Sequence, residues 1–262
     1  MKTQNKFNWK VFLTLWSAAI LGILAVLPYA LTLQASILEQ VTATIPLGVL
    51  VAAQIIQSAV LFGVAIAIGL PLSKQIGTGV PILEKVFAGE KVADQVKPFL
   101  LPIILFGVIG GLVIYGLDTF VFMPALQSAL LQGAGASSSD TTPWQGLLAS
   151  FYGGIDEEIL LRLFLMSLLA WAGKFIRHTT EGKPTPAILW AANIVAAVLF
   201  GLGHLPATAA IMTITPLVIV RAIVLNGSLG VGFGYFYTKY GLESAMLSHF
   251  SADIILHVVF SI

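Results

Sequence analysis

The chain has 262 residues, of which 58% are hydrophobic and 10% are charged, and its mean hydropathy is +0.96. This composition excludes a soluble globular domain and predicts an integral membrane protein that crosses the bilayer several times. A formal net charge of +1 argues against nucleic acid as a partner, because no basic face could neutralise several phosphates. Cysteine is absent, which excludes disulfides, thiol nucleophiles and cysteine metal ligands.

Long hydrophobic runs follow one another along the chain, each of a length that spans the hydrocarbon core of a bilayer as a helix. They fall at about 11–33, 46–72, 99–123, 144–172, 187–210, 213–238 and 241–261. We therefore expect an all-α, polytopic bundle of about seven transmembrane helices, with six to eight allowed because Pro206 and Pro216 permit a re-entrant break. The first run is too long for the apolar part of a signal peptide, so it is expected to remain as a helix.

Basic residues occupy alternate connections between these runs. Lysines occur in the N-terminal segment, in 74–97, in 174–183 and at Lys239, whereas 34–45 and 133–143 contain neither lysine nor arginine. By the positive-inside rule, the N-terminus is expected in the cytoplasm and the C-terminus outside. The stretch 81–97 interleaves charged with apolar residues, which predicts either a helix on the membrane surface or a solvated connector.

Ionisable residues are distributed unevenly over the spans. The first three spans carry almost none apart from Asp118. The last four contain Asp156, Glu157, Glu158, Arg162, His204, Arg221, His249, Asp253 and His257. Ionisable groups are costly in hydrocarbon and usually mark a cavity or a reaction centre. We therefore predict packing or partner-binding helices in 1–143 and a catalytic or transport core in 144–262.

Two adjacent carboxylates, Glu157 and Glu158, share one apolar run with Arg162. Glu158 and Arg162 are four residues apart and can form an ion pair on one face of a helix. Glu157 points about 100° away around the helix, so it is the carboxylate left free to meet another helix. The alternative is a buried polar network of all three side chains that only fixes helix packing. Asp156 is given no role, because it could belong to the site or simply face a cavity.

Histidines mark two further candidate regions, one around His204 and one in the last span. His204 lies two residues before Pro206, and the residue that precedes a proline is disfavoured in a helix, so we expect a helix break at or just after His204. His249, Asp253 and His257 follow at intervals of four and share one stripe of a helix. A histidine and a carboxylate at this spacing can form a hydrogen bond or bind a metal. The alternatives are a core histidine at 204 and an interhelical hydrogen-bond ladder in the last span, where His257 is the least expected participant.

Arg221 is a further charge within a span. We expect it to pair with Asp118 or with an active-site acid, or to extend its apolar stem toward the interface. Gly230 and Gly234 form a small-xxx-small pair, which suits close contact between helices.

Three short motifs follow one another in the chain: Glu157-Glu158-x-x-x-Arg162, Phe200-x-x-x-His204 and His249-x-x-x-Asp253. In this order they resemble the motif set of the CPBP family, the CAAX proteases and bacteriocin-processing proteins that are also called the Abi family. The resemblance covers about 144–257. It implies an intramembrane endopeptidase, a hydrolase that cleaves membrane-associated peptide or protein substrates within the lipid bilayer. It also indicates a multi-pass protein of a bacterial plasma membrane.

The resemblance also implies roles for individual residues. Glu157 would activate the attacking water, with His204 holding it, and His249 and Asp253 would stabilise the oxyanion of the tetrahedral intermediate. An ionised Asp253 would repel an oxyanion, so this residue is expected to be protonated or to orient His249 instead. Glu158 and Arg162 match motif positions and are expected to act as a supporting pair.

The cofactor and the function each retain an alternative. Family members are commonly called metalloproteases, so a divalent metal such as zinc is one expectation, with Glu157, His204 and His249 as its candidate ligands. Metal-free attack by a glutamate-activated water fits the same residues. Two other functions also fit: a family member without proteolysis, in bacteriocin immunity or as a scaffold, and a proton- or cation-coupled transporter, because chains of acids and histidines form proton relays.

Overall fold

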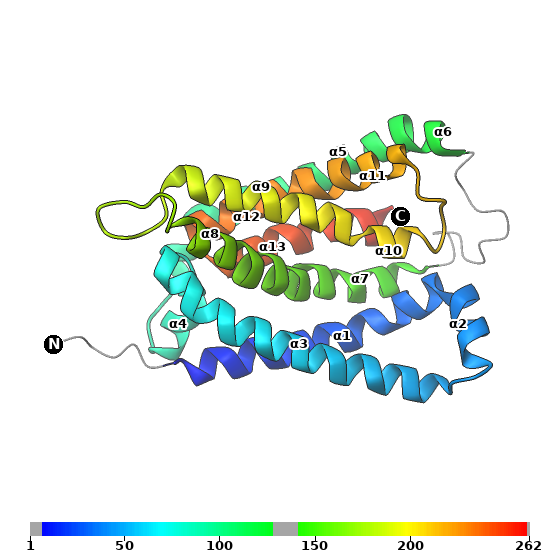
Figure 1. Ribbon diagram of the computed structural model, residues 1–262, viewed down its shortest axis with the longest axis horizontal. Helices are drawn as coiled ribbons and strands as arrows, with labels where there is room; N and C mark the ends of the chain where they lie inside the picture. The colour runs from blue at the N-terminus through cyan, green and yellow to red at the C-terminus, as the bar shows by residue number, and fades with distance from the viewer. Residues whose placement is uncertain (1–6, 128–140, 261–262) are drawn as a thin grey trace.

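A computed structural model describes residues 7–127 and 141–260, and these residues form a helical bundle without β-strands (Figure 1). The main helical runs contain α1 (Trp9–Leu33), α3 (Leu47–Ile76), α5 (Ala93–Leu117), α7 (Pro143–Phe151), α8 (Ser167–Gly173), α9 (Pro186–Gly203), α11 (Pro216–Ala222), α12 (Ser228–Tyr240) and α13 (Leu242–Asp253). Short helices connect them: α2 (Ala35–Thr42), α4 (Pro81–Phe87), α6 (Met123–Leu126) and α10 (Leu205–Thr208). The predicted all-α class is thereby confirmed.

Five helical stretches in the described part of the chain are long and apolar enough to cross a membrane. They are Trp9–Leu33, Leu47–Ile76, Ala93–Leu126, Pro186–Thr208 and Pro216–Tyr240. Two more continuous helical runs, 143–173 and 242–259, hold most of the charged residues of the expected core. The chain therefore has the helices of an integral membrane protein, and the count of about seven spans stays a prediction.

The helical run 143–173 begins at a well-defined cap. Thr142 and Gln145 form a capping box, and Pro143 occupies the first turn, where its missing N–H costs nothing. The Gln145 side-chain amide also donates to the Pro28 carbonyl at 3.0 Å and to the Thr32 hydroxyl at 2.9 Å, both in α1. The cap therefore both starts this helix and fixes it to α1.

The run 143–173 occupies the centre of the bundle. It contacts α1 and α3 on one side and α9 and α13 on the other. Figure 1 shows α1 and α3, joined by α2, as one layer, with α7 and α8 next to them and α5, α9 and α12 beyond. Any side chain on this central helix is therefore surrounded by other helices, which suits a buried site.

Glycines allow the tightest helix contacts. A Cβ added to Gly107 of α5 would lie 2.2 Å from the Ser248 carbonyl oxygen of α13, so only glycine permits this approach. At Gly234 of α12, an added Cβ would lie 1.9 Å from the Asn193 side chain of α9, whose amide donates to the Val231 carbonyl. The packing role expected of Gly234 therefore agrees with the contact between α9 and α12.

The two ends of the bundle differ in charge. In Figure 1 the start of α1, α4 and the loop after α8 lie at one end, and α2, α6 and α10 lie at the other. The lysines of the connections gather at the first of these ends, which is called the basic end below. The stretch 81–97 is not one helix, because α4 ends at Phe87 and α5 begins at Ala93. Whether it lies on a membrane surface stays a prediction.

Candidate active site

The central helix leaves α-helical geometry where its charged residues lie. π-helical turns span Tyr152–Glu157 and Ile159–Met166, between α7 and α8. Such wide turns are rare and are frequent at functional sites. The Glu157 side chain is 21% exposed, whereas that of Glu158 is fully buried. The two adjacent carboxylates therefore occupy different surroundings, as their spacing predicts.

Glu158 joins two partners behind the exposed part of the site. Its Oε2 lies 3.2 Å from Arg162 Nε, and its Oε1 accepts a hydrogen bond from His249 Nδ1 at 2.8 Å. Arg162 is also buried, donates to the Gly230 carbonyl at 2.8 Å, and lies 5.3 Å from the Phe200 ring centroid. The pairing of Glu158 with Arg162 agrees with the prediction. The bond to His249 was not predicted, because it joins residues 91 positions apart.

His249 is held in one orientation by this bond. An ionised carboxylate can only accept, so Nδ1 carries the proton that it donates to Glu158. The other nitrogen, Nε2, faces Glu157 Oε2 at 3.7 Å and Asp253 Oδ1 at 3.5 Å. The ring is stacked on Phe233, with centroids 4.5 Å apart and planes inclined by 18°. Both distances from Nε2 exceed a direct hydrogen bond, so Nε2 is not tied to either acid.

Gly153 makes the approach of Asp253 possible. A Cβ at this position would lie 2.0 Å from Asp253 Oδ2 and 3.3 Å from His249 Nε2. Any other residue would therefore displace Asp253 from the central helix. Sequence reasoning missed Gly153; the only signal was its position in a Gly-Gly pair just before the acidic cluster.

His204 lies at the predicted interruption of its helix. α9 ends at Gly203 and α10 begins at Leu205, so the break is confined to the histidine itself. His204 Nδ1 lies 2.9 Å from the Phe200 carbonyl oxygen, which can only accept, so Nδ1 is the donor. In the neutral ring, Nε2 is then an acceptor.

A cavity of about 790 Å³ brings the predicted residues together. Glu157, His204, His249 and Asp253 all line it, whereas Glu158 and Arg162 lie behind its wall. Much of the facing wall is apolar and comes from α1 and α3, with Leu27, Leu31, Leu47, Leu50 and Val51 among its residues. Glu157 also interacts electrostatically with His204, His249 and Asp253. The cavity therefore combines the Glu157 carboxylate, the imidazoles of His204 and His249, and space for a substrate.

Asp156 lies outside this cavity lining. Its side chain is fully buried against α1, and a Cβ at Gly22 would lie 1.8 Å from its Oδ2. Neither carboxylate oxygen has a hydrogen-bond partner among the residues that the structure describes. The structure therefore separates Asp156 from Glu157 and Glu158, although the three are consecutive.

Arg221 and Asp118 form a second charged feature of the cavity wall. Arg221 Nε and Nη2 each donate to an Asp118 carboxylate oxygen at 2.6 Å. Of the partners expected for Arg221, the structure therefore shows Asp118 and not an active-site acid. His257 also lines the cavity, where its ring lies 5.6 Å from that of Tyr29.

The described residues do not form a ready metal site. Within 7–127 and 141–260, no group of three or more histidine, aspartate or glutamate side chains has the arrangement that holds a metal ion. One nitrogen of His249 is already engaged by Glu158, and one nitrogen of His204 by a backbone carbonyl. The zinc hypothesis therefore stays a prediction, and no step below is derived through a metal.

Comparison with known protein families gives one match. Residues 139–255 match the family described as type II CAAX prenyl endopeptidase Rce1-like. The match contains all three motifs, and it confirms the resemblance to the CAAX protease family over this part of the chain. Comparison with curated proteins and with solved structures gave no significant match. The class defined by fold and family is thus a helical membrane protein related to CAAX endopeptidases.

Proposed function

We propose that this protein is an intramembrane endopeptidase that uses Glu157 to activate water for the hydrolysis of a peptide bond. The observation that carries the proposal is the cavity in which Glu157, His204 and His249 meet inside a bundle of apolar helices. Peptide hydrolysis needs a base for water and a donor for the developing oxyanion. These residues offer both.

Glu157 and His204 bind the attacking water in this mechanism. Because His204 Nδ1 donates to a backbone carbonyl, its Nε2 lone pair is free to accept a hydrogen bond from water. Glu157 accepts the second hydrogen of the same water and removes it as the oxygen attacks the carbonyl carbon. Glu157 suits this role better than Glu158, because Glu158 already has Arg162 and His249 as partners.

His249 stabilises the oxyanion through Nε2. Since Nδ1 already carries the proton donated to Glu158, Nε2 can donate only when the ring is an imidazolium. Asp253, 3.5 Å from Nε2, compensates that positive charge. Asp253 is thus a positioning residue that acts through His249. The imidazolium charge in turn offsets the repulsion between the Asp253 carboxylate and the oxyanion.

The tetrahedral intermediate then collapses to products. The carbonyl double bond re-forms, the C–N bond breaks, and Glu157 returns its proton to the leaving amine. The products are a new carboxyl group and a new amino group, and one water is consumed. The apolar wall from α1 and α3 suits a substrate that is itself embedded in, or anchored to, the membrane.

A comparison of purified variants tests this function. The wild type, Glu157→Gln and His204→Ala are incubated with a library of membrane-anchored peptides, and the products are identified by mass spectrometry. We expect the loss of the general base to lower cleavage by about 100-fold or more. Glu39→Gln, an exposed change on α2, serves as the matched control and keeps wild-type activity.

Full cleavage by both variants would refute the assignment of these residues. Proteoliposomes made from the same preparations test the transport alternative, because transport predicts proton or ion flux without peptide products. Metal analysis of the active protein tests the zinc hypothesis, and a stoichiometric metal that is needed for cleavage would support it.

A further inference from the structure

The cavity occupies only one half of the bundle along its length. In α1 its lining begins at Ile23 and continues to the end of the helix, and in α3 it runs from Leu47 only to Gln54. These segments meet at α2, at the end opposite the basic end (Figure 1). Ala207 and Thr208 of α10 line the cavity at the same end. The cavity therefore extends from the centre of the bundle toward this end.

The other half of the bundle is closed by packed side chains. On α1, Leu15 and Ala19, which precede the cavity, are buried, and on α3 Phe62 and Ile66 are buried. The central helix continues past Glu157 with Leu163 and Met166, which are fully buried. These residues belong to one continuous hydrophobic core. No lining residue of the cavity comes from α4, α8 or the described loop 174–185.

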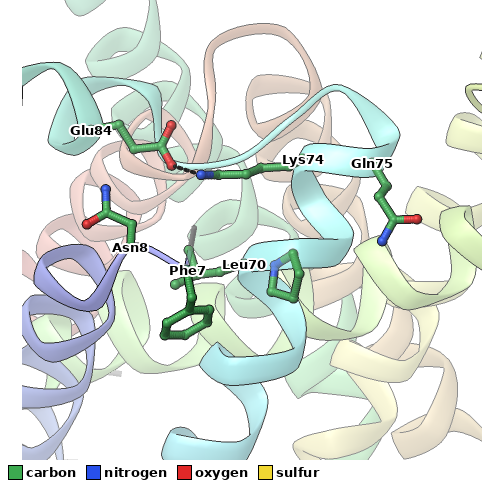
Figure 2. Close-up of a pocket in the computed structure, with 7 residues that line it drawn as sticks. Phe7, Asn8, Leu70, Lys74, Gln75 and Glu84 are labelled. Atoms are coloured by element: carbon green, nitrogen blue, oxygen red, sulfur yellow. Dashed lines mark ion pairs between the residues drawn. The ribbon is translucent and has the colours of Figure 1, made fainter. Parts of the chain in front are cut away.

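A separate pocket of about 410 Å³ lies at the basic end (Figure 2). Phe7, Leu70 and Pro71 line its apolar part, and Lys74 and Glu84 form an ion pair of 2.8 Å beside it. It shares no lining residue with the cavity that holds Glu157. This pocket is therefore not an entrance to the candidate active site.

Charge distinguishes the two ends as sharply as packing does. The basic end carries the connections 74–97 and 174–183 with their lysines, together with Lys239 at the end of α12. The described connections at the cavity end, 34–46, 118–127 and 204–215, contain no lysine or arginine. A contrast of this kind between short connections sets the orientation of a membrane protein, with the basic end in the cytoplasm.

We propose that the candidate active site opens to the extracytoplasmic face of the membrane, and that its substrates are peptide segments presented from that face. They would be exported, membrane-associated peptides or the outer ends of transmembrane segments, and not tails in the cytoplasm. That these peptides are substrates rests on the proposed function, whereas the side to which the site opens rests only on the cavity and on the charges at the two ends. It adds to the protease assignment the side from which a peptide reaches Glu157.

Site-directed labelling decides the direction, because the natural chain contains no cysteine. Single variants Ala207→Cys at the cavity end, Leu160→Cys in the cavity and Thr180→Cys in the loop at the basic end are expressed in cells. Right-side-out and inside-out vesicles are then treated with a membrane-impermeant maleimide. Ala170→Cys, fully buried in the packed half, controls for labelling of buried sites.

We expect Ala207→Cys and, more slowly, Leu160→Cys to react in right-side-out vesicles, and Thr180→Cys only in inside-out vesicles. Labelling of Leu160→Cys from the same side as Thr180→Cys would overturn the proposal. Gln34→Cys, also exposed in the cavity wall, replaces Ala207→Cys if that variant does not accumulate.

An activity measurement separates this inference from the protease assignment. An impermeant anchored peptide that is a confirmed substrate of the purified protein is added to the two kinds of vesicle, and cleavage is expected only in the right-side-out ones. Cleavage restricted to inside-out vesicles would overturn the direction while leaving the protease assignment intact. If the purified protein cleaves no peptide, the protease assignment fails, and the labelling pattern still decides the direction.

Discussion

Two arginine–carboxylate pairs lie inside this bundle, and they are built differently. Glu158 and Arg162 are one helical turn apart and almost fully buried, and they have His249, Gly230 and two aromatic rings as further partners. Arg221 and Asp118 come from different helices, and their side chains are 22% and 8% exposed. The second pair faces the cavity, and in the described part of the chain its hydrogen bonds join only Arg221 and Asp118 and do not include His249.

The difference indicates why each pair is kept. A buried ion pair contributes little net stability, because desolvation offsets much of the attraction. The Glu158–Arg162 pair is therefore better explained by what it orients, namely the imidazole of His249. The Arg221–Asp118 pair joins the π-helical turn Asp118–Phe122, which follows α5, to α11 and forms part of the cavity wall. One pair serves the site, and the other serves the arrangement of helices around it.

The largest effect on stability is expected from Glu158→Gln. This change leaves Arg162 buried without a counter-charge, which should lower stability by about 3–5 kcal/mol. It should also lower kcat by about 10–100-fold, because His249 loses the carboxylate that fixes its tautomer. Thermal unfolding in detergent and peptide-cleavage kinetics measure the two effects. An unchanged midpoint together with unchanged kcat would show that the two pairs are equivalent.

Gly153→Ala tests how precisely His249, the hydrogen-bond partner of Glu158, must be positioned. The added methyl group meets Asp253 Oδ2, so the positions of Asp253 and His249 must shift. A misplacement of this size should lower kcat by about 100-fold. Gly116→Ala, where a Cβ meets nothing within 4 Å, is the matched control and should stay active. Equal activity of both variants would contradict the role given to Asp253.

Arg221→Met breaks the second pair. Because Asp118 then faces the cavity without its partner, stability should fall by about 2 kcal/mol, between the values for exposed and buried pairs. Cleavage should stay within about twofold of the wild type, since separate sites couple weakly. The double variant with Asp118→Asn should recover part of the lost stability. A large loss of kcat in Arg221→Met would instead place this pair in the site.

The smallest effect is expected from Asp156→Asn. Asp156 has no hydrogen-bond partner among the described residues, and an amide costs less to bury than a charge. We therefore expect unchanged or slightly higher stability and cleavage within about twofold of the wild type. Denaturation curves and kinetics on the same preparation check this. A loss as large as that of Glu157→Gln would give Asp156 a part in the chemistry.

Much of the architecture could be predicted from local patterns. Runs of apolar residues predicted the helices to within a few residues, and the proline after His204 predicted its interruption. The spacing of four between Glu158 and Arg162 predicted their ion pair. These features depend on residues within one or two helical turns, and such geometry is the same in every helix.

Contacts between distant residues could not be predicted in this way. The bond from His249 to Glu158, the stacking of His249 on Phe233 and the space left by Gly153 each depend on how two helices cross. Asp156 shows that two residues adjacent in the chain need not share a site. It is adjacent to Glu157 in the chain, yet the rotation of the central helix turns it toward α1 and away from the cavity.

The sequence by itself determined that this is a helical membrane protein, that its charges gather in the second half of the chain, and that three motifs resemble those of CAAX proteases. Helix periodicity and hydrophobicity are local, so a single chain displays them directly. Only the tertiary structure decided that Glu158 serves His249, that Asp118 is the partner of Arg221, and at which end of the bundle the cavity lies. Those outcomes depend on the packing of helices that are far apart in the chain, where a small rotation exchanges one neighbour for another.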